Sequence, residues 1–222
     1  MVKVSLEKRV LSKNDRIAQK IRSQLHMKGV GCINLIGSPG SGKTALLEAS
    51  LPRMSDGLRC AVIEGDVKTD RDMQRIAAVG VDAVQIETGG GCHLDAELVT
   101  KGLAKLPLGK LDLLIIENVG NLICPVAYDL GEDYRLIVVS VAEGEDKPLK
   151  YPSAFVSASG IVVTKTDLSS YVDVEASQVA ANALSLNPKL KVFTTSTKTG
   201  EGIEEFADFL VSVGKSARSM RK

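Results

Sequence analysis

The sequence is poor in the features that mark membrane and secreted proteins. It contains four Cys, no Trp and only four each of Phe and Tyr in 222 residues. The cysteines lie far apart, which argues against the crowded disulfide framework of a small secreted domain and favours a reducing compartment. No stretch approaches the roughly 18 consecutive apolar residues that cross a bilayer, and the charged N-terminus lacks the apolar segment of a signal peptide. We therefore expect a cytoplasmic protein.

The overall charge is nearly balanced and conceals basic ends. The chain has 28 Lys and Arg against 27 Asp and Glu, a net charge of +1. Lys and Arg are concentrated in residues 1–29 and 215–222, so the part between them is acidic. Residues 4–26 also place apolar side chains at helical intervals, which predicts an amphipathic helix. No aromatic side chains interleave its charges, so we expect it to pack on its own domain, without a nucleic-acid or membrane partner.

Beyond Gly31, short apolar runs alternate with amphipathic segments. Their continuous hydrophobicity is typical of strands buried on both faces of a parallel sheet. The runs are Cys32–Ile36, Arg59–Ile63, Ala83–Ile86, Leu111–Ile116, Leu136–Val141, Ile161–Val163 and Val192–Thr195. The candidate helices are Lys43–Leu51, Asp70–Val79, Leu94–Leu106, Val174–Leu186 and Ile203–Val213. We predict one α/β domain, an open, mostly parallel sheet with helices on both faces over residues 30–222, preceded by the helix of residues 1–29.

Residues 37–44, GSPGSGKT, carry the strongest local signal. They fit the P-loop pattern, and they follow an apolar run and precede a helical pattern, which is the context that such a motif requires. Glycines let backbone N–H groups turn inward around phosphate oxygens, and the helix N-terminus adds partial positive charge. We expect Lys43 to neutralise the β- and γ-phosphates and the Thr44 hydroxyl to bind Mg²⁺. The other predicted phosphate-binding residues are Gly37, Gly40, Ser41 and Gly42.

Two acidic residues follow predicted strands, where a P-loop protein holds its metal ion. Asp66 comes shortly after one apolar run, and Glu117 directly follows another. We expect both to bind magnesium, directly or through water, and Glu117 is the stronger candidate because its run is wholly apolar. Gly120 is expected to bring its backbone N–H to the γ-phosphate. With Lys43, these are the predicted catalytic residues; the other interpretation is that the acids simply begin solvated loops.

Two later segments predict that the base is guanine. The sequence TKTD at residues 164–167 fits the [N/T]KxD element of P-loop GTPases. Asp167 would accept from guanine N1–H and the N2 amino group, a donor pair that adenine lacks, and the stem of Lys165 would lie over the ring. Ser196, Thr197 and Lys198 form a Ser-x-Lys loop, which would contact the guanine oxygen through backbone N–H groups. Each motif alone is weak, but their order favours GTP over ATP.

A further group of residues suits a transition metal. Cys92 and His93 lie side by side after three glycines, and Cys124 lies shortly beyond Glu117. Thiolate and imidazole together suit Zn²⁺ or Ni²⁺ and poorly suit Mg²⁺ or Ca²⁺. The adjacent pair lacks the spacing of a zinc motif, so ordinary buried residues are the other interpretation, as we expect for Cys32 and Cys60. Three ligands would leave a coordination position open, which suggests a transfer site or a metal shared across a symmetric dimer.

Four segments carry a likeness to a known family. They are residues 65–67 (GDV), 91–96 (GCHLDA), 117–125 (ENVGNLICP) and 129–132 (DLGE). Together they resemble the nickel–iron hydrogenase maturation GTPases, the HypB family, over essentially all of residues 30–213. The resemblance implies a Mg²⁺-dependent GTPase of the P-loop NTPase fold that helps deliver nickel to the hydrogenase large subunit. It also implies a HypA-type partner, a nucleotide-dependent homodimer, and nickel or zinc at Cys92, His93 and Cys124.

Two departures from the family pattern matter. Some members carry an N-terminal Cys-rich or His-rich stretch, whereas here no Cys precedes Cys32 and His26 is the only His in that region. This speaks against a separate tight nickel site or a storage role, and we expect His26 to belong to the N-terminal helix. The guanine element begins with Thr164 where Asn is usual. Because Asn often ties this loop to the P-loop, we expect altered loop rigidity with base selection by Asp167 unchanged.

The order of the motifs also suggests how nucleotide and metal are coupled. Glu117 and Gly120 would sense the γ-phosphate, and Cys124 follows shortly after them on the same backbone. GTP binding would therefore shift this segment and assemble two sets of Cys92, His93 and Cys124 across a dimer. Hydrolysis would then loosen the two sets and release the metal. The nearest alternative is a related metallochaperone GTPase for urease or a cobalamin enzyme. A P-loop small-molecule kinase is a more distant one, because it has no use for residues 164–167. A nucleic-acid adaptor using the basic N-terminus would bind in a strongly salt-dependent way.

Overall fold

The computed structural model describes residues 6–54, 57–66 and 70–221. In this part of the chain, seven parallel strands form one sheet in the order β3-β2-β4-β1-β5-β6-β7. The strands are β1 (Gly31–Gly37), β2 (Cys60–Asp66), β3 (Asp82–Glu87), β4 (Leu113–Glu117), β5 (Tyr134–Ser140), β6 (Gly160–Thr164) and β7 (Lys191–Thr194). The predicted α/β fold with an open parallel sheet is confirmed.

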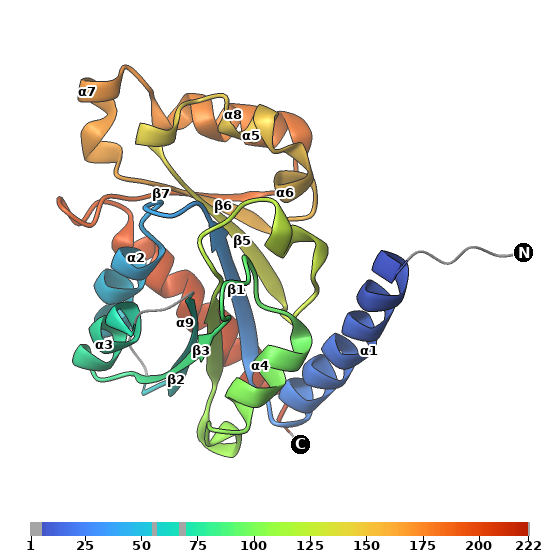
Figure 1. Ribbon diagram of the computed structural model, residues 1–222. Helices are drawn as coiled ribbons and strands as arrows, with labels where there is room; N and C mark the ends of the chain where they lie inside the picture. The colour runs from blue at the N-terminus through green and yellow to red at the C-terminus, as the bar shows by residue number, and fades with distance from the viewer. Residues whose placement is uncertain (1–5, 55–56, 67–69, 222) are drawn as a thin grey trace, which may run out of the picture.

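Helices cover both faces of this sheet. They are α1 (Leu6–Met27), α2 (Lys43–Ser50), α3 (Arg71–Ala78), α4 (Ala96–Leu103), α5 (Lys147–Lys150), α6 (Pro152–Val156), α7 (Ser169–Val172), α8 (Ala176–Leu186) and α9 (Ile203–Ser219). Figure 1 shows α2, α3 and α9 on one side of the sheet and α1 and α4 on the other. The connection after β4 includes a short 3₁₀ helix, Cys124–Ala127.

The alternation of side chains along each strand divides the core between the two faces. In β1, Ile33 and Leu35 join the cluster that packs against α2 and α9. Cys32 points to the other face, into the cluster of α1 and α4, and Ile36 joins the third cluster, beneath α6 and α8. Every residue of β1 is buried, as expected for a central parallel strand. This central strand leads directly into the P-loop.

Several predicted helix boundaries were wrong by two or more residues. Helix α4 begins at Ala96 rather than Leu94, because the Asp95 side chain caps it by accepting from Leu98 N at 2.7 Å. It also ends at Leu103, short of the predicted Leu106. Helix α9 continues to Ser219, beyond the predicted end at Val213. The short helices α5, α6 and α7 were not predicted, because four or five residues carry too little periodicity to reveal a helix.

Helix α1 packs one face on the rest of the protein, as predicted. Ala18, Ile21 and Leu25 are buried against α4 and the strands. A Cβ on Gly131 would lie 2.8 Å from Ala18 O, so the loop before β5 needs glycine to pass this close to α1. His26 lies in α1 and pairs with Asp133 at 2.7 Å. Residues 4 and 5 of the predicted helix lie outside the described residues.

Two of the four cysteines lie in or against the core, as expected from their places in apolar runs. Cys32 is fully buried and Cys60 is half-buried against the core, and all four cysteines are free thiols. No helix in the described ranges is long and apolar enough to cross a membrane.

Candidate functional site

The P-loop of residues 37–44 lies between the carboxyl end of β1 and the start of α2. Gly40 and Gly42 have φ of +75° and +95°, which glycine adopts without the steric penalty of a side chain. The Lys43 ammonium folds back into the loop and donates to the carbonyl oxygens of Gly37 at 3.2 Å and Ser38 at 3.4 Å. Lys43 and Thr44 are each 6 % exposed, so the charge and the hydroxyl lie within the loop and face its concave side.

Glu117 lies at the end of β4, directly beside the P-loop. Thr44 Oγ1 donates a 2.8 Å hydrogen bond to Glu117 Oε1. In the parallel register of β2 and β4, Glu64 is the partner of Glu117. Both acids are buried, and among the described residues Glu64 Oε1 and Glu117 Oε2 have no hydrogen-bond partner. Two carboxyl groups therefore meet where only Glu117 had been predicted.

The proximity and burial of these carboxyl groups mean that their charge must be compensated by a proton or a cation. Burial and the neighbouring Glu117 raise the pKa of Glu64 to about 11, and burial also raises the pKa of Glu117, whereas Lys43 acts in the opposite direction. A buried carboxyl pair cannot hold two negative charges without compensation. Hydroxyl and carboxylate oxygens are the hard ligands that Mg²⁺ prefers. The donor set of Thr44, Glu117 and Glu64 therefore fits a magnesium ion.

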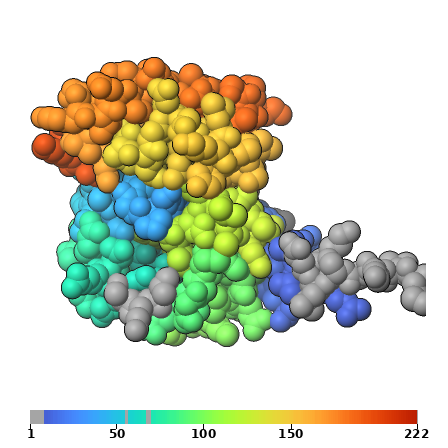
Figure 2. All heavy atoms as spheres, turned by 45° about the horizontal axis from the view of Figure 1, so that its top comes forward, coloured from blue at the N-terminus to red at the C-terminus, as the bar shows by residue number. Residues whose placement is uncertain are grey.

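A cleft of about 550 Å³ lies in front of the P-loop, within the size range of small-ligand sites. It is lined by the P-loop, the ends of β2 and β4, α3 and Lys165, and both Asp66 and Gly120 belong to this lining. A Cβ on Gly120 would lie 3.0 Å from the backbone N of Pro39, so only glycine fits this close against the P-loop. Figure 2 shows the light-blue P-loop region beside the yellow-green segment that follows β4.

The predicted guanine segments approach the P-loop from the carboxyl ends of β6 and β7. Thr164 Oγ1 donates to Ser41 O at 2.6 Å, and Lys165 Nζ donates to Gly40 O at 2.7 Å. The threonine that replaces the usual asparagine thus makes its own tie to the P-loop, so the departure does not leave this loop untethered. Lys165 has φ of +58°, the left-handed conformation in which a non-glycine residue is strained.

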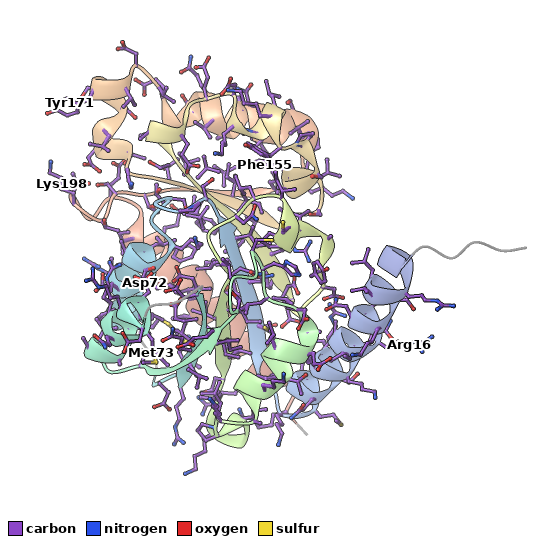
Figure 3. All side chains as sticks on the ribbon, in the orientation of Figure 1. Arg16, Asp72, Met73, Phe155, Tyr171 and Lys198 are labelled. Atoms are coloured by element: carbon purple, nitrogen blue, oxygen red, sulfur yellow. The ribbon has the colours of Figure 1, made fainter. Side chains whose placement is uncertain are left out.

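Asp167 lies next to the second predicted guanine loop. Its Oδ1 accepts from Ser196 Oγ at 2.5 Å. The same hydroxyl oxygen accepts from the backbone N–H groups of Lys198 and Thr199, both at 3.2 Å. Ser196 is buried, whereas Thr197 and Lys198 are exposed, and Figure 3 shows Lys198 extending from the loop after β7. The structure thus brings the two predicted guanine segments together and ties the first of them to the P-loop.

The three predicted transition-metal ligands also converge. Cys92 and His93 come from the loop before α4, and Cys124 starts the 3₁₀ helix after β4. Their ligand atoms all lie within 4.8 Å of one another, and Cys92 Sγ is 3.6 Å from His93 Nδ1. Two sulfurs and an imidazole nitrogen are a donor set for Ni²⁺ or Zn²⁺, which tolerate soft ligands.

The surroundings of this cluster favour the metal-binding protonation state of His93 but not that of Cys92. Burial lowers the pKa of His93, so the neutral imidazole that binds metals is favoured. The hydrogen bond with Cys124 raises the pKa of Cys92, so this thiol must give up its proton when it binds a metal ion. The His93 ring is stacked on Tyr128 with centroids 4.0 Å apart, which fixes its plane. Tyr128 was not predicted, because nothing in its local sequence indicates the stack.

Comparison with known proteins identifies the family. The family model described as the CobW/HypB/UreG nucleotide-binding domain matches residues 32–194. Hydrogenase maturation factor HypB of Rhizobium leguminosarum bv. viciae is 45% identical over 218 residues, which cover 98% of this chain and 73% of that protein. The chain belongs to the HypB family. The resemblance seen in the sequence is thereby confirmed.

Solved structures of the same family have this fold. The crystal structure of HypB from Archaeoglobus fulgidus is 41% identical with a TM-score of 0.85, covering 91% of this chain and 99% of that one. HypB from Helicobacter pylori, crystallised in complex with nickel, is 36% identical with a TM-score of 0.86, covering 95% and 98%. Membership makes this chain a nucleotide-binding P-loop protein of the hydrogenase maturation factors.

Sequence reasoning missed several residues that line the cleft. Glu64 is the most important, and its signal was an acid at the end of an apolar run, two residues before the predicted Asp66. Asp72 and Arg75 of α3 also line the cleft, and Arg75 pairs with Asp72 at 3.0 Å and with Glu48 at 2.5 Å. Figure 3 shows Asp72 on α3, facing the side of α2. Their position depends on how α3 packs on α2, which no local pattern reports.

Proposed function

We propose that this protein hydrolyses GTP and uses the nucleotide state to bind and release nickel for a hydrogenase large subunit. The observation that carries this proposal is the adjacency of the two candidate sites. One short connection, residues 117–124, begins at the Glu117 carboxylate in the phosphate cleft and ends at the Cys124 thiol in the metal cluster. A change at the γ-phosphate therefore needs to travel only a few residues to reach a metal ligand.

The nucleotide half of the proposal rests on the P-loop and the two guanine segments. Lys43 would neutralise the β- and γ-phosphates, the glycines and Ser41 would present backbone N–H groups, and the Gly120 N–H would meet the γ-phosphate. Asp167 would accept from guanine N1–H and N2, and its hydrogen bond with Ser196 orients the carboxylate for this task. The residues proposed to contact the nucleotide are Gly37, Gly40, Ser41, Gly42, Lys43, Thr44, Gly120, Lys165, Asp167, Ser196, Thr197 and Lys198.

Thr44, Glu117 and Asp66 would hold Mg²⁺, directly or through water, and Glu64 adds a buried carboxyl group beside them. When bound, the ion would neutralise charge on the phosphate oxygens. Before binding, the Thr44 hydroxyl satisfies one oxygen of Glu117, and the proton held by the carboxyl pair limits its charge. The chain's own contribution is thus a preformed set of oxygen ligands, held by the adjacent ends of β2 and β4 and by the first turn of α2.

Nickel would be the cargo of Cys92, His93 and Cys124. Three ligands leave a fourth position for a ligand from a second copy or a receiving protein, which suits a site that must also give up its metal. A nucleotide-dependent homodimer would place two such sets together, and a HypA-type chaperone would be a partner in delivery to the hydrogenase large subunit. The nickel complex of the Helicobacter pylori relative supports nickel as the cargo.

A titration of nickel into the GDP-bound protein and into the protein with a non-hydrolysable GTP analogue tests this proposal. Thiolate-to-metal absorption reports binding, and light scattering reports the oligomeric state. We expect different nickel affinities in the two states and a larger particle with the GTP analogue, because the γ-phosphate engages the connection that carries Cys124. Equal affinities and equal particle sizes would reject the proposal. Competition of ATP against GTP in the same samples separates it from a kinase function.

A further inference from the structure

Residues 118–121 lie between the phosphate cleft and the metal cluster and touch both. On the cleft side, Gly120 packs against Pro39 so closely that a Cβ would lie 2.9 Å from the proline ring. The next residue, Asn121, forms an antiparallel bridge with Gly37, the first residue of the P-loop. This segment is therefore held to the P-loop by backbone contacts, and a shift of either would displace the other.

On the metal side, the same segment holds the backbone on both sides of His93. Asn118 Oδ1 accepts a 3.0 Å hydrogen bond from Leu94 N. Asn121 Nδ2 donates a 3.4 Å hydrogen bond to Cys92 O. The two asparagines lie on either side of Gly120 and bind the residues that flank His93. The loop with two of the three metal ligands is therefore attached to the segment proposed to meet the γ-phosphate.

Burial makes the Asn118 link rigid. Asn118 is 1 % exposed and Leu94 is fully buried, so water cannot replace this hydrogen bond without opening the core. The Leu94 side chain also packs on Gly65, where a Cβ would lie 2.7 Å from Leu94 Cγ. Asn118 Nδ2 donates to Asn34 Oδ1 at 3.4 Å, which anchors the amide to β1. The Leu94 amide must consequently follow the strand ends that line the cleft.

We propose that Asn118 and Asn121 are positioning residues that couple the γ-phosphate site to the metal cluster. Closure of Gly120 on the γ-phosphate moves the two amides, which shift the Leu94 N–H and the Cys92 carbonyl and so reorient Cys92 and His93 relative to Cys124. The coupling role rests on the proposed function. It adds that the effect of γ-phosphate binding also reaches the loop before α4, through side-chain hydrogen bonds. Backbone continuity to Cys124 alone would reach one ligand; the asparagine pair reaches the other two.

The decisive test compares nickel affinity with saturating GDP and with a saturating non-hydrolysable GTP analogue, in wild type, Asn121→Ala and Asn118→Ala. Coupling free energies between sites usually correspond to about 5- to 150-fold in affinity. We expect the wild-type ratio to lie in this range and the ratio of each variant to fall to about twofold or less, which is close to no coupling. The nucleotide-induced change in the nickel–thiolate absorption band should disappear together with the ratio.

The reciprocal measurement distinguishes coupling from a merely structural role. Linkage requires nickel to change the affinity for the GTP analogue by the same factor, so this effect should vanish in parallel. Asn182→Ala is the matched control, because Asn182 Nδ2 also donates to a backbone carbonyl, that of Glu145 at 2.8 Å, but lies on α8 outside both sites. It should keep the wild-type ratio. Asn121 is only half-buried, so Asn121→Ala decides the question if Asn118→Ala does not fold.

The outcomes separate the two proposals. A wild-type ratio of one overturns both the nucleotide-dependent metal handling and the asparagine coupling. A clear wild-type ratio that persists in Asn121→Ala overturns the coupling role alone and leaves the proposed function standing.

Discussion

The phosphate cleft and the metal cluster are neighbours built in opposite ways. Lys43 and Thr44 are each 6 % exposed and belong to one continuous strand–turn–helix unit, so the nest of N–H groups is complete within residues 37–44. Cys92 is exposed, His93 and Cys124 are half-buried, and they come from two loops. Within the cleft, the P-loop is preorganised by one local segment, whereas the metal cluster depends on the packing of two. This difference is what the proposed function requires, a fixed phosphate cradle beside an adjustable metal cluster.

Substitution of the P-loop lysine should separate the two sites most strongly. Lys43→Ala removes a buried positive charge from the phosphate cradle, and we expect kcat/KM for GTP to fall by about 100- to 1,000-fold, as when one preorganised electrostatic group is lost. Nickel affinity without nucleotide should stay unchanged, because the Lys43 ammonium donates to the Gly37 and Ser38 carbonyl oxygens within the P-loop, away from the cysteines. Steady-state GTP hydrolysis and nickel titration measure both.

Lys189→Ala, at an exposed lysine outside both sites, is the control for this experiment. A Lys43→Ala protein that hydrolyses GTP at the wild-type rate would mean that the cleft is not the nucleotide site.

Loss of one thiol should have the converse effect. Cys124→Ala removes one of three ligands, and we expect nickel affinity to fall by at least about 10- to 100-fold, the loss that even outer-shell substitutions produce. GTP affinity should be retained, because the sulfur lies in the cluster with Cys92 and His93 rather than in the lining of the cleft. Isothermal titration with each ligand gives both values.

The half-buried Cys60 supplies the control, since Cys60→Ala removes a thiol that lies in β2 outside the cluster. Unaltered nickel binding in Cys124→Ala would exclude this cysteine from the site.

The smallest expected effect concerns the tie between the guanine segment and the P-loop. Thr164→Val keeps the shape of the side chain but removes the 2.6 Å hydrogen bond to Ser41 O. Because a buried carbonyl loses its partner, we expect the free energy of unfolding to fall by about 1–3 kcal/mol. Chemical denaturation measures this loss, and GTP affinity should fall with it as the guanine loop loosens.

Thr164→Ser retains the hydroxyl and should retain most of the stability. If valine and serine behave alike, the hydrogen bond contributes nothing to holding the loop, and the altered rigidity expected from the missing asparagine would stand.

The parts of the molecule that could be predicted are those whose signals are local. The apolar run before Gly37 and the helical pattern after Thr44 located the P-loop, because a strand, a tight glycine turn and a helix are each determined by adjacent residues. The buried position of Cys32 followed from its place in an apolar run. The motif likeness in residues 117–125 indicated the family, which the comparisons confirm.

The parts that could not be predicted depend on which strand lies beside which. Glu64 meets Glu117 only because β2 and β4 are adjacent and in one particular register. Thr164 reaches Ser41 across 123 residues of sequence, and Leu94 reaches Asn118 across 24. The stack of Tyr128 on His93 is of the same kind. Each contact joins segments that are distant in the sequence, and the local pattern of one segment does not predict its contact with the other.

By itself, then, the sequence determined the alternating strands and helices, the P-loop, and the residue types suited to guanine and to a soft metal ion. These features could be predicted because backbone conformational preference and side-chain chemistry act over a few adjacent residues. The tertiary structure decided that the two acids share one buried edge, that a threonine takes over the tie to the P-loop, and that three ligands from two loops converge beside the cleft. These outcomes required the strand order and the burial of polar groups, whose hydrogen bonds must be satisfied within the fold.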